Sequence, residues 1–167
     1  MNKITRNILT AFLLIIAQTI IFNNINLFGY LNPFVYIIFI IYYPIKNDRL
    51  FFIFISFTLG LLIDIFTDTL GLHAAASVTV AYLRPFILKI SFGLAYIHQI
   101  IKFNNIDFKN KLIYISLLTI VHHAVLFSLE IFNLSKTLFI FDRIIMSSVF
   151  TITLCILFSY LFKTNER

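Results

Sequence analysis

Residues 50–66 read LFFIFISFTLGLLIDIF, an apolar run with one ionisable residue, Asp64, near its end. A helix of about 20 largely apolar residues is needed to cross the ~30 Å hydrocarbon core of a bilayer. This run is apolar on every side, whereas a helix on the surface of a soluble domain keeps a polar face. The stretch therefore predicts a membrane-spanning helix.

The rest of the chain has the same character. Of its 167 residues, 60% are hydrophobic and 12% are charged, against about 25% charged residues in a typical soluble domain. A chain this short cannot hide so many apolar side chains in one core. We therefore expect an all-α, polytopic membrane protein that forms a single domain over residues 1–167.

Six apolar runs, separated by short polar turns, predict a bundle of about six transmembrane helices. Asn32-Pro33 is expected to open the second helix, because asparagine caps helix starts and proline tolerates the first helical position. That helix is short, so neighbouring protein must shield its entry loop. The apolar segment Phe92–Ile101 is expected to form an interfacial helix or to extend the fourth helix. The six expected helices are Ile4–Phe22, Pro33–Ile45, Leu50–Phe66, Leu72–Ile90, Leu112–Phe132 and Leu138–Phe162.

The basic residues predict an orientation for this bundle. With six crossings, about ten of the 13 lysines and arginines fall on the side of the two termini. Cytoplasmic loops are enriched in these residues, so both termini are expected in the cytoplasm. The basic residues lie at membrane edges and not along one polar face, which argues against nucleic-acid binding.

Several ionisable residues are expected at helix depth, where such groups usually face the bundle and have a partner. Arg143 can pair with Asp64, Glu130 or Asp142 near the outer helix ends. Structural pairing of helix ends is the preferred interpretation, and a grip on a partner or ligand is the alternative. Arg84 lies deeper. Either the following Pro85 breaks the helix and lets Arg84 reach Asp64, or Arg84 snorkels to the inner interface.

The residue types and motifs that most often carry out catalysis or bind metal ions do not predict such a site in this chain. Adjacent helical residues such as His122 and His123 point about 100° apart and do not easily share one ion, so ordinary hydrogen-bonded histidines are expected. Cys155 lies in an apolar run and is expected to face lipid or to pack. The chain has no phosphate-binding loop, zinc-protease motif or nucleophile elbow. We expect a protein that is not an enzyme and needs no metal or cofactor.

Gly60 and Asp64 lie one helical turn apart and therefore share a face. Glycine lets two helices approach closely, and an aspartate beside it can hydrogen-bond across the contact. The expected partner surface is the small-residue stretch Ala74–Ser77 on the next helix.

The chain resembles the MreD family, the rod shape-determining membrane proteins of bacteria, in three motifs: Asn32-Pro33, Gly60-x-x-x-Asp64 and Thr69-Leu-Gly71-Leu-His73. The similarity spans nearly the whole chain in length and hydrophobicity. It implies a multi-pass protein of the bacterial inner membrane, similar in fold to the substrate-binding S components of energy-coupling-factor (ECF) transporters. The candidate partner-binding residues are Asn32, Pro33, Gly60, Asp64, Gly71 and His73, and the candidate structural or ion-pairing residues are Arg84, Glu130, Asp142 and Arg143.

Two functions remain open at this point. The preferred one, implied by the resemblance, is a non-catalytic scaffold of the cell-elongation complex. Such a scaffold binds MreC within and beside the membrane and works with MreB, the RodA glycosyltransferase and a penicillin-binding transpeptidase. The alternative is a solute-binding membrane subunit of a vitamin transporter, because ionisable residues gather at the outer level, where an outward-facing pocket would lie.

Overall fold

The computed structural model describes residues 3–27, 29, 31–45, 48–97, 106–131 and 136–161. In these residues it has five helical segments long and apolar enough to cross a membrane, which confirms an all-α polytopic protein. The α-helices are α1 (Lys3–Ile16), α2 (Ile37–Tyr42), α3 (Arg49–Thr67), α4 (Leu72–Phe92), α5 (Leu94–Ile97), α6 (Phe108–Ile131) and α7 (Thr137–Leu161).

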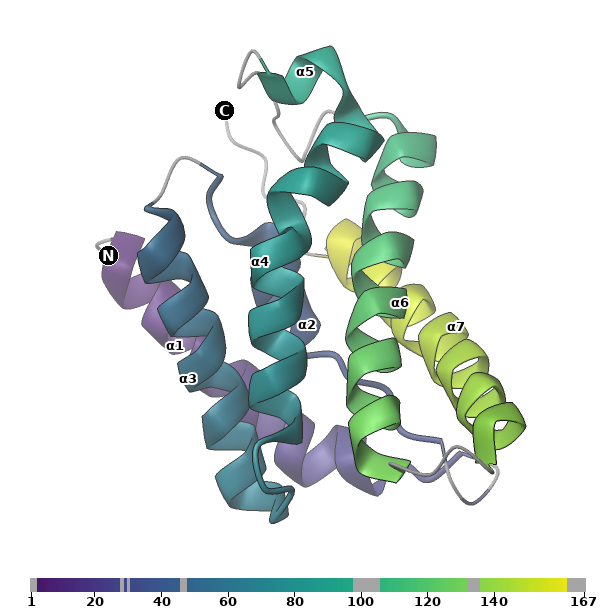
Figure 1. The fold of residues 1–167 in the computed structure, drawn as a ribbon. Helices are drawn as coiled ribbons and strands as arrows, with labels where there is room; N and C mark the ends of the chain where they lie inside the picture. The colour runs from purple at the N-terminus through teal and green to yellow at the C-terminus, as the bar shows by residue number, and fades with distance from the viewer. Residues whose placement is uncertain are drawn as a thin grey trace.

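The chain passes up and down through the bundle, as Figure 1 shows. In that view α1 descends, and residues 31–45, here called the α2 segment, return upward through the interior. Then α3 descends, α4 ascends, α6 descends and α7 ascends. The start of α1 and the end of α7 therefore lie towards the same end of the bundle, here called the upper end. The α3–α4 and α6–α7 turns lie at the lower end.

The prediction of a second helix over Pro33–Ile45 is wrong in its extent. The α-helix α2 has only six residues, Ile37–Tyr42, and is preceded by a turn. It ends because Pro44 pushes Tyr43 into an extended conformation, with φ −57° and ψ 139°. Its apolar side chains are mostly buried, and it contacts α1, α4 and α6. As expected for an irregular segment at membrane depth, surrounding protein shields it.

The first span also differs from the straight helix expected over Ile4–Phe22. The α-helix α1 ends at Ile16 and continues as a π-helix over Ala17–Ile21, followed by a 3₁₀ turn over Phe22–Asn24. A π-helical turn changes the direction in which its side chains point relative to a regular α-helix. Here the polar side chain of Gln18 is fully buried.

The helices α3 and α4 form a tight hairpin. Asp48 caps α3, because its side chain accepts hydrogen bonds from the backbone N–H groups of Leu50 (2.8 Å) and Phe51 (3.4 Å). The helix ends at Thr67 and is followed by Asp68, which has a left-handed conformation (φ 55°), and α4 begins after Gly71 (φ 93°). Glycine adopts such a positive φ without steric cost, which permits the sharp turn.

The connection after α4 follows the expected extension of the fourth helix only as far as Phe92. The helix α4 continues through Pro85 to Phe92, and Gly93 (φ 50°) then separates it from the short helix α5. The rest of that segment, from residue 98, lies outside the described residues. The helix α6 begins at Phe108, four residues before the expected start at Leu112.

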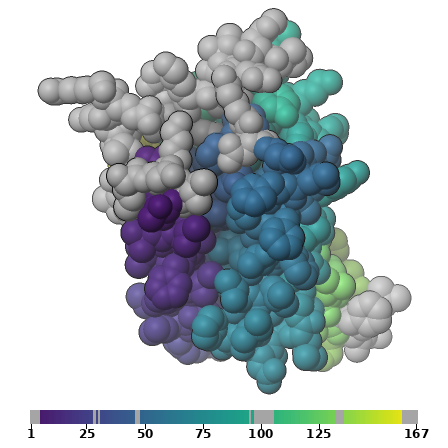
Figure 2. Space-filling view, turned by 90° about the vertical axis from the view of Figure 1, so that its left-hand side faces the viewer, coloured from purple at the N-terminus to yellow at the C-terminus, as the bar shows by residue number. Residues whose placement is uncertain are grey.

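The core lies between α3, α4 and α6, and the outer helices are exposed. Within the most apolar window of each span, 44% of the residues are buried in α4 and in α6, against 22% in α7 and 11% in the first span. Figure 2 shows α1 and α3 side by side on one face of the bundle. These outer faces present apolar side chains, as expected for contact with lipid or with another membrane helix.

Candidate functional site

Asp64 joins the end of α3 to the start of α4. It is 4% exposed. Its carboxylate accepts hydrogen bonds from the backbone N–H groups of His73 (3.0 Å) and Ala74 (2.8 Å) and from the hydroxyl of Thr69. The first N–H groups of a helix have no partner within the helix, and a negative charge there is favoured by the helix dipole. Asp64 therefore caps α4 from the preceding helix.

Gly60 lies one turn earlier on the same face of α3 and touches the backbone of α4. A Cβ atom at this position would lie 2.5 Å from the carbonyl oxygen of His73 and 2.6 Å from the Cα atom of Ala74. Atoms cannot approach so closely, so only glycine permits this helix contact. The predicted packing of Gly60 against the small residues of the next helix is confirmed.

Three histidines and a tyrosine form a buried polar cluster where the start of α2 meets α4 and α6. The hydroxyl of Tyr36 contacts Nδ1 of His73 at 3.1 Å and Nε2 of His122 at 2.5 Å. A hydroxyl has one proton, so it donates to one of these ring nitrogens and accepts from the other. All three side chains are at most 4% exposed. Tyr36 thus links α4 and α6 to the start of α2.

His123 connects the same cluster to α7. Its Nδ1 lies 2.7 Å from the carbonyl oxygen of Thr119, and its Nε2 lies 3.2 Å from the hydroxyl of Thr151. A carbonyl only accepts, so in a neutral imidazole Nδ1 carries the proton and Nε2 accepts from Thr151. The Thr151 oxygen in turn accepts from the backbone N–H of Phe34 at 3.1 Å. The prediction of ordinary hydrogen-bonded histidines is confirmed.

The side chain of Gln18 binds the beginning of the α2 segment to the first span. Its amide nitrogen donates to the carbonyl oxygen of Pro33 (2.9 Å) and to the side-chain oxygen of Asn23 (2.7 Å), and its oxygen accepts from the backbone N–H of Tyr36 (3.3 Å). These bonds satisfy backbone groups that an irregular segment leaves free. The carbonyl oxygen of Pro33 is therefore a hydrogen-bond acceptor inside the bundle, and Pro33 is not the first residue of a helix.

Asn32 does not cap a helix either, which corrects the second part of that prediction. Its side-chain oxygen accepts from the backbone N–H of Asn26 at 2.8 Å, and its amide nitrogen donates to the Asn26 side chain at 3.3 Å. Between them, Leu27 and Leu31 exchange two backbone hydrogen bonds of 2.9 Å around Gly29. Asn32 therefore closes a small loop at the lower end of the bundle.

A pocket of about 420 Å³ opens at this lower end. Its walls come from the end of the first span, the Asn32 loop, the α3–α4 turn and the end of α6. Most of its polar groups are neutral amides and hydroxyls, and its ionisable lining residues are His73 and Glu130. The lining residues are Thr19, Asn23, Asn24, Asn32, Phe34, Phe66, Thr67, Thr69, Leu72, His73, Leu126 and Glu130.

Arg143 forms an ion pair with Glu130, one of its three predicted partners. Its Nη1 lies 3.1 Å from Oε1 of Glu130, and its guanidinium also lies over the ring of Phe127, 5.0 Å from the centroid. Asp142 is exposed, and Asp64 binds backbone N–H groups instead. The pair joins the ends of α6 and α7 at the partly exposed lower end.

Arg84 follows neither of the two arrangements left open for it. It is only 3% exposed, so it does not snorkel. Its Nε donates to the hydroxyl of Tyr114 at 2.8 Å, and its Nη2 donates to the carbonyl oxygens of Ile41 (3.1 Å) and Tyr43 (2.5 Å). Arg84 thus caps the carboxyl end of α2, where a positive charge is favoured. The helix α4 continues unbroken through Pro85.

The candidate partner-binding residues divide into two groups. The side chains of Asp64 and His73 and the backbone of Gly60 face the interior of this chain, so any effect of theirs on a partner is transmitted through the α3–α4 hairpin. Asn32 and Gly71 are partly exposed at the lower end. Within the described part of the chain, no cluster of three or more His, Cys, Asp or Glu side chains is arranged to hold a metal ion. Cys155 is buried in α7.

The sequence interpretation missed Gln18, Tyr36, Tyr114 and Thr151. Each is a polar residue within an apolar run, the type of residue that marks an inward-facing position in a membrane helix. That signal was present, but their partners lie up to 117 residues away along the chain. Comparison with family models, with curated proteins and with solved structures gave no match to this chain.

Proposed function

We propose that this protein is a non-catalytic membrane scaffold of the bacterial cell-elongation complex, which binds MreC in the inner membrane. The observation that carries the proposal is the two-sided character of α3, the helix with the Gly60 and Asp64 residues of the MreD resemblance. One face is fixed to α4 by these two residues. The adjoining flank of the helix presents a row of exposed apolar side chains at helical spacing, namely Leu50, Phe54, Phe57, Leu61 and Ile65.

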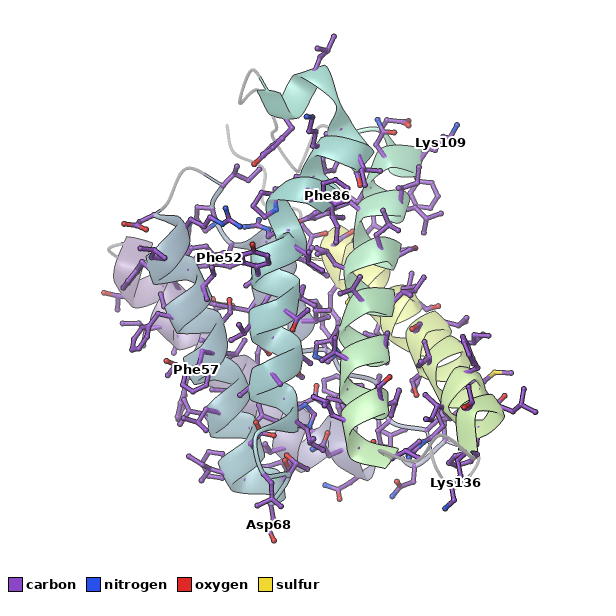
Figure 3. The ribbon with its side chains drawn as sticks, viewed as in Figure 1. Phe52, Phe57, Asp68, Phe86, Lys109 and Lys136 are labelled. Atoms are coloured by element: carbon purple, nitrogen blue, oxygen red, sulfur yellow. The ribbon has the colours of Figure 1, made fainter. Side chains whose placement is uncertain are left out.

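This row suits the transmembrane helix of a partner. A face held rigid by its own hairpin loses little conformational freedom when a second helix packs on it. Phe57 lies on α3 (Figure 3), and it is 41% exposed. The proposed orientation places the α3–α4 turn outside the cytoplasm, on the side where a periplasmic partner continues from its membrane helix.

Co-purification with MreC tests this proposal. The double variant Phe54→Ala/Phe57→Ala removes two large side chains from the exposed row. Phe141→Ala/Ile145→Ala is the matched control, because both of its side chains are exposed on α7. We expect the α3 variant to capture several-fold less MreC at equal membrane abundance, and the α7 variant to capture the wild-type amount. Equal capture by the two variants contradicts docking on α3.

The lower-end pocket favours a second function, that of a solute-binding membrane subunit. Its volume of about 420 Å³ lies within the ~300–1,000 Å³ typical of small-molecule sites. Native mass spectrometry of the purified protein tests this function directly. This function requires one bound small molecule per chain. The Asn32→Ala variant should lose that molecule, and the Asp142→Ala variant should keep it, because Asp142 is exposed and lies outside the pocket lining. Protein that carries no such ligand from cells grown in rich medium contradicts this second function.

A further inference from the structure

A second cavity, of about 260 Å³, lies towards the upper end of the bundle, between the end of the α2 segment, α3, α4 and α5. Two arginines, Arg49 and Arg84, line it, and none of its lining residues is acidic. Tyr96 supplies a phenol, and the walls include the apolar side chains of Phe52 and Leu88. Two guanidinium groups in an otherwise apolar cavity favour an anion.

The charge of Arg84 has no negative partner within the described residues. Its hydrogen-bond partners there, the Tyr114 hydroxyl and two backbone carbonyls, are neutral. Its guanidinium also lies over the ring of Phe52, 4.9 Å from the centroid, which again supplies no full negative charge. In the part of the chain that the structure describes, the one salt bridge is that of Arg143 with Glu130. A buried cation without a counter-ion is costly in a membrane protein.

Arg49 is held at the rim of this cavity. Its Nη2 donates to the carbonyl oxygen of Tyr82 at 3.3 Å, and its guanidinium lies 4.9 Å from the centroid of the Tyr82 ring. These contacts orient the guanidinium while leaving donors for another acceptor. A rim arginine and a buried arginine in one cavity can together hold the several oxygens of a phosphate group.

The surroundings of the cavity point to a membrane lipid as the source of this phosphate. Lys89 and Lys109 are exposed at the same end of the bundle, and Figure 3 shows Lys109 projecting there. Basic residues at one membrane edge attract anionic head groups. Phe86 and Ile90 on α4 are exposed near the same level, where acyl chains would pack. Apolar walls beside two arginines match a molecule with an anionic head and an apolar tail.

We propose that this cavity binds the phosphate-bearing head group of an anionic membrane lipid, with Arg84 and Arg49 as its ligands. The bound phosphate supplies the counter-ion that Arg84 lacks among the described residues, and it joins the end of the α2 segment to α3 and α4. The proposal is independent of the scaffold function, because it concerns the opposite end of the bundle and needs no protein partner.

Native mass spectrometry with defined lipids tests it. The purified protein is titrated with phosphatidylglycerol and, separately, with phosphatidylcholine. Arg49→Gln is the test variant, because Arg84 also caps α2 and its loss would disturb the fold. Lys89→Gln is the matched control, since it removes the same charge from the same end but does not line the cavity. We expect one phosphatidylglycerol per chain, bound about tenfold more weakly by Arg49→Gln and unchanged in Lys89→Gln.

Three results would overturn the proposal. The first is equal binding of phosphatidylglycerol and phosphatidylcholine, which would mean that the anionic head group is not recognised. The second is an equal loss of affinity in Arg49→Gln and Lys89→Gln, which would reduce the effect to net charge. The third is binding of inorganic phosphate, measured by calorimetry, in protein that does not retain phosphatidylglycerol, which would assign the cavity to a free anion.

Discussion

The Asp64 carboxylate in α3 accepts a hydrogen bond from the backbone N–H of Ala74 in α4 at 2.8 Å. Ala74 is also the residue whose Cα atom leaves no room for a side chain at Gly60. One short segment of α4 is therefore held twice by α3, once through a hydrogen bond and once through backbone contact. This double contact makes the hairpin a rigid unit, on which the proposed docking face depends.

Asp64→Asn should destabilise the protein. His73 and Ala74 donate to different oxygens of the carboxylate, so the N–H₂ group of the amide faces the backbone N–H of one of them, and that buried donor loses its partner. The expected loss is about 1–3 kcal/mol in the free energy of unfolding. Reversible unfolding in detergent micelles measures it. Asp68→Asn, at an exposed position in the same turn, should change little, and an equal loss in both variants would argue against the cap.

Gly60→Ala should separate α3 from α4. The added methyl group meets backbone atoms, which cannot rotate away as a side chain can. Overpacking of this kind typically costs about 1–3 kcal/mol. The thermal unfolding midpoint in micelles reports the loss, with Leu61→Ala on the exposed face of the same helix as the control. A Gly60→Ala variant as stable as the wild type would show that the helices are not in backbone contact.

Tyr36→Phe removes the hydroxyl between His73 and His122 while keeping the ring. Both ring nitrogens then lose a partner in a buried site. We expect a loss of about 1–3 kcal/mol and increased hydrogen exchange in α2, measured by mass spectrometry. Tyr82→Phe, at an exposed tyrosine, is the control. Unchanged exchange and stability in Tyr36→Phe would mean that the cluster does not hold the α2 segment.

The proposed orientation can be tested with single cysteines in a Cys155→Ala background. Asp68 and Lys136 are exposed at the lower end, and Lys109 is exposed at the upper end (Figure 3). The distribution of basic residues predicts that the upper end lies in the cytoplasm. Cysteines at 68 and 136 should react with a membrane-impermeant maleimide in spheroplasts, and a cysteine at 109 only after lysis. Labelling of 109 in intact spheroplasts would reverse the orientation.

Membrane character, most helices and the Gly60–Asp64 face could be predicted from the sequence because they depend on local composition and spacing. The predicted bounds of α3 and α4 agree with the structure to within two residues. The α2 segment could not be predicted, because its short helix depends on buried contacts with Gln18 and Arg84. An Asn-Pro pair favours a helix start locally, but here tertiary hydrogen bonds determine the conformation.

The candidate site could be predicted from the sequence only in part, for the same reason. The pairing of Arg143 with Glu130 was among the predicted options, since both residues lie near helix ends. The links from Tyr36 to His73 and His122 join residues 37 and 86 positions apart. Neither spacing nor composition carries information about such contacts.

The most direct test of the scaffold account is photo-crosslinking in living bacteria that produce MreC. A photoreactive phenylalanine analogue replaces Phe57 on the exposed face of α3 or, in a matched strain, Phe141 on α7, both of which are exposed. The account predicts a crosslink to MreC from position 57 and none from position 141. Crosslinks to lipid alone from position 57, in cells where MreC is abundant, would contradict it.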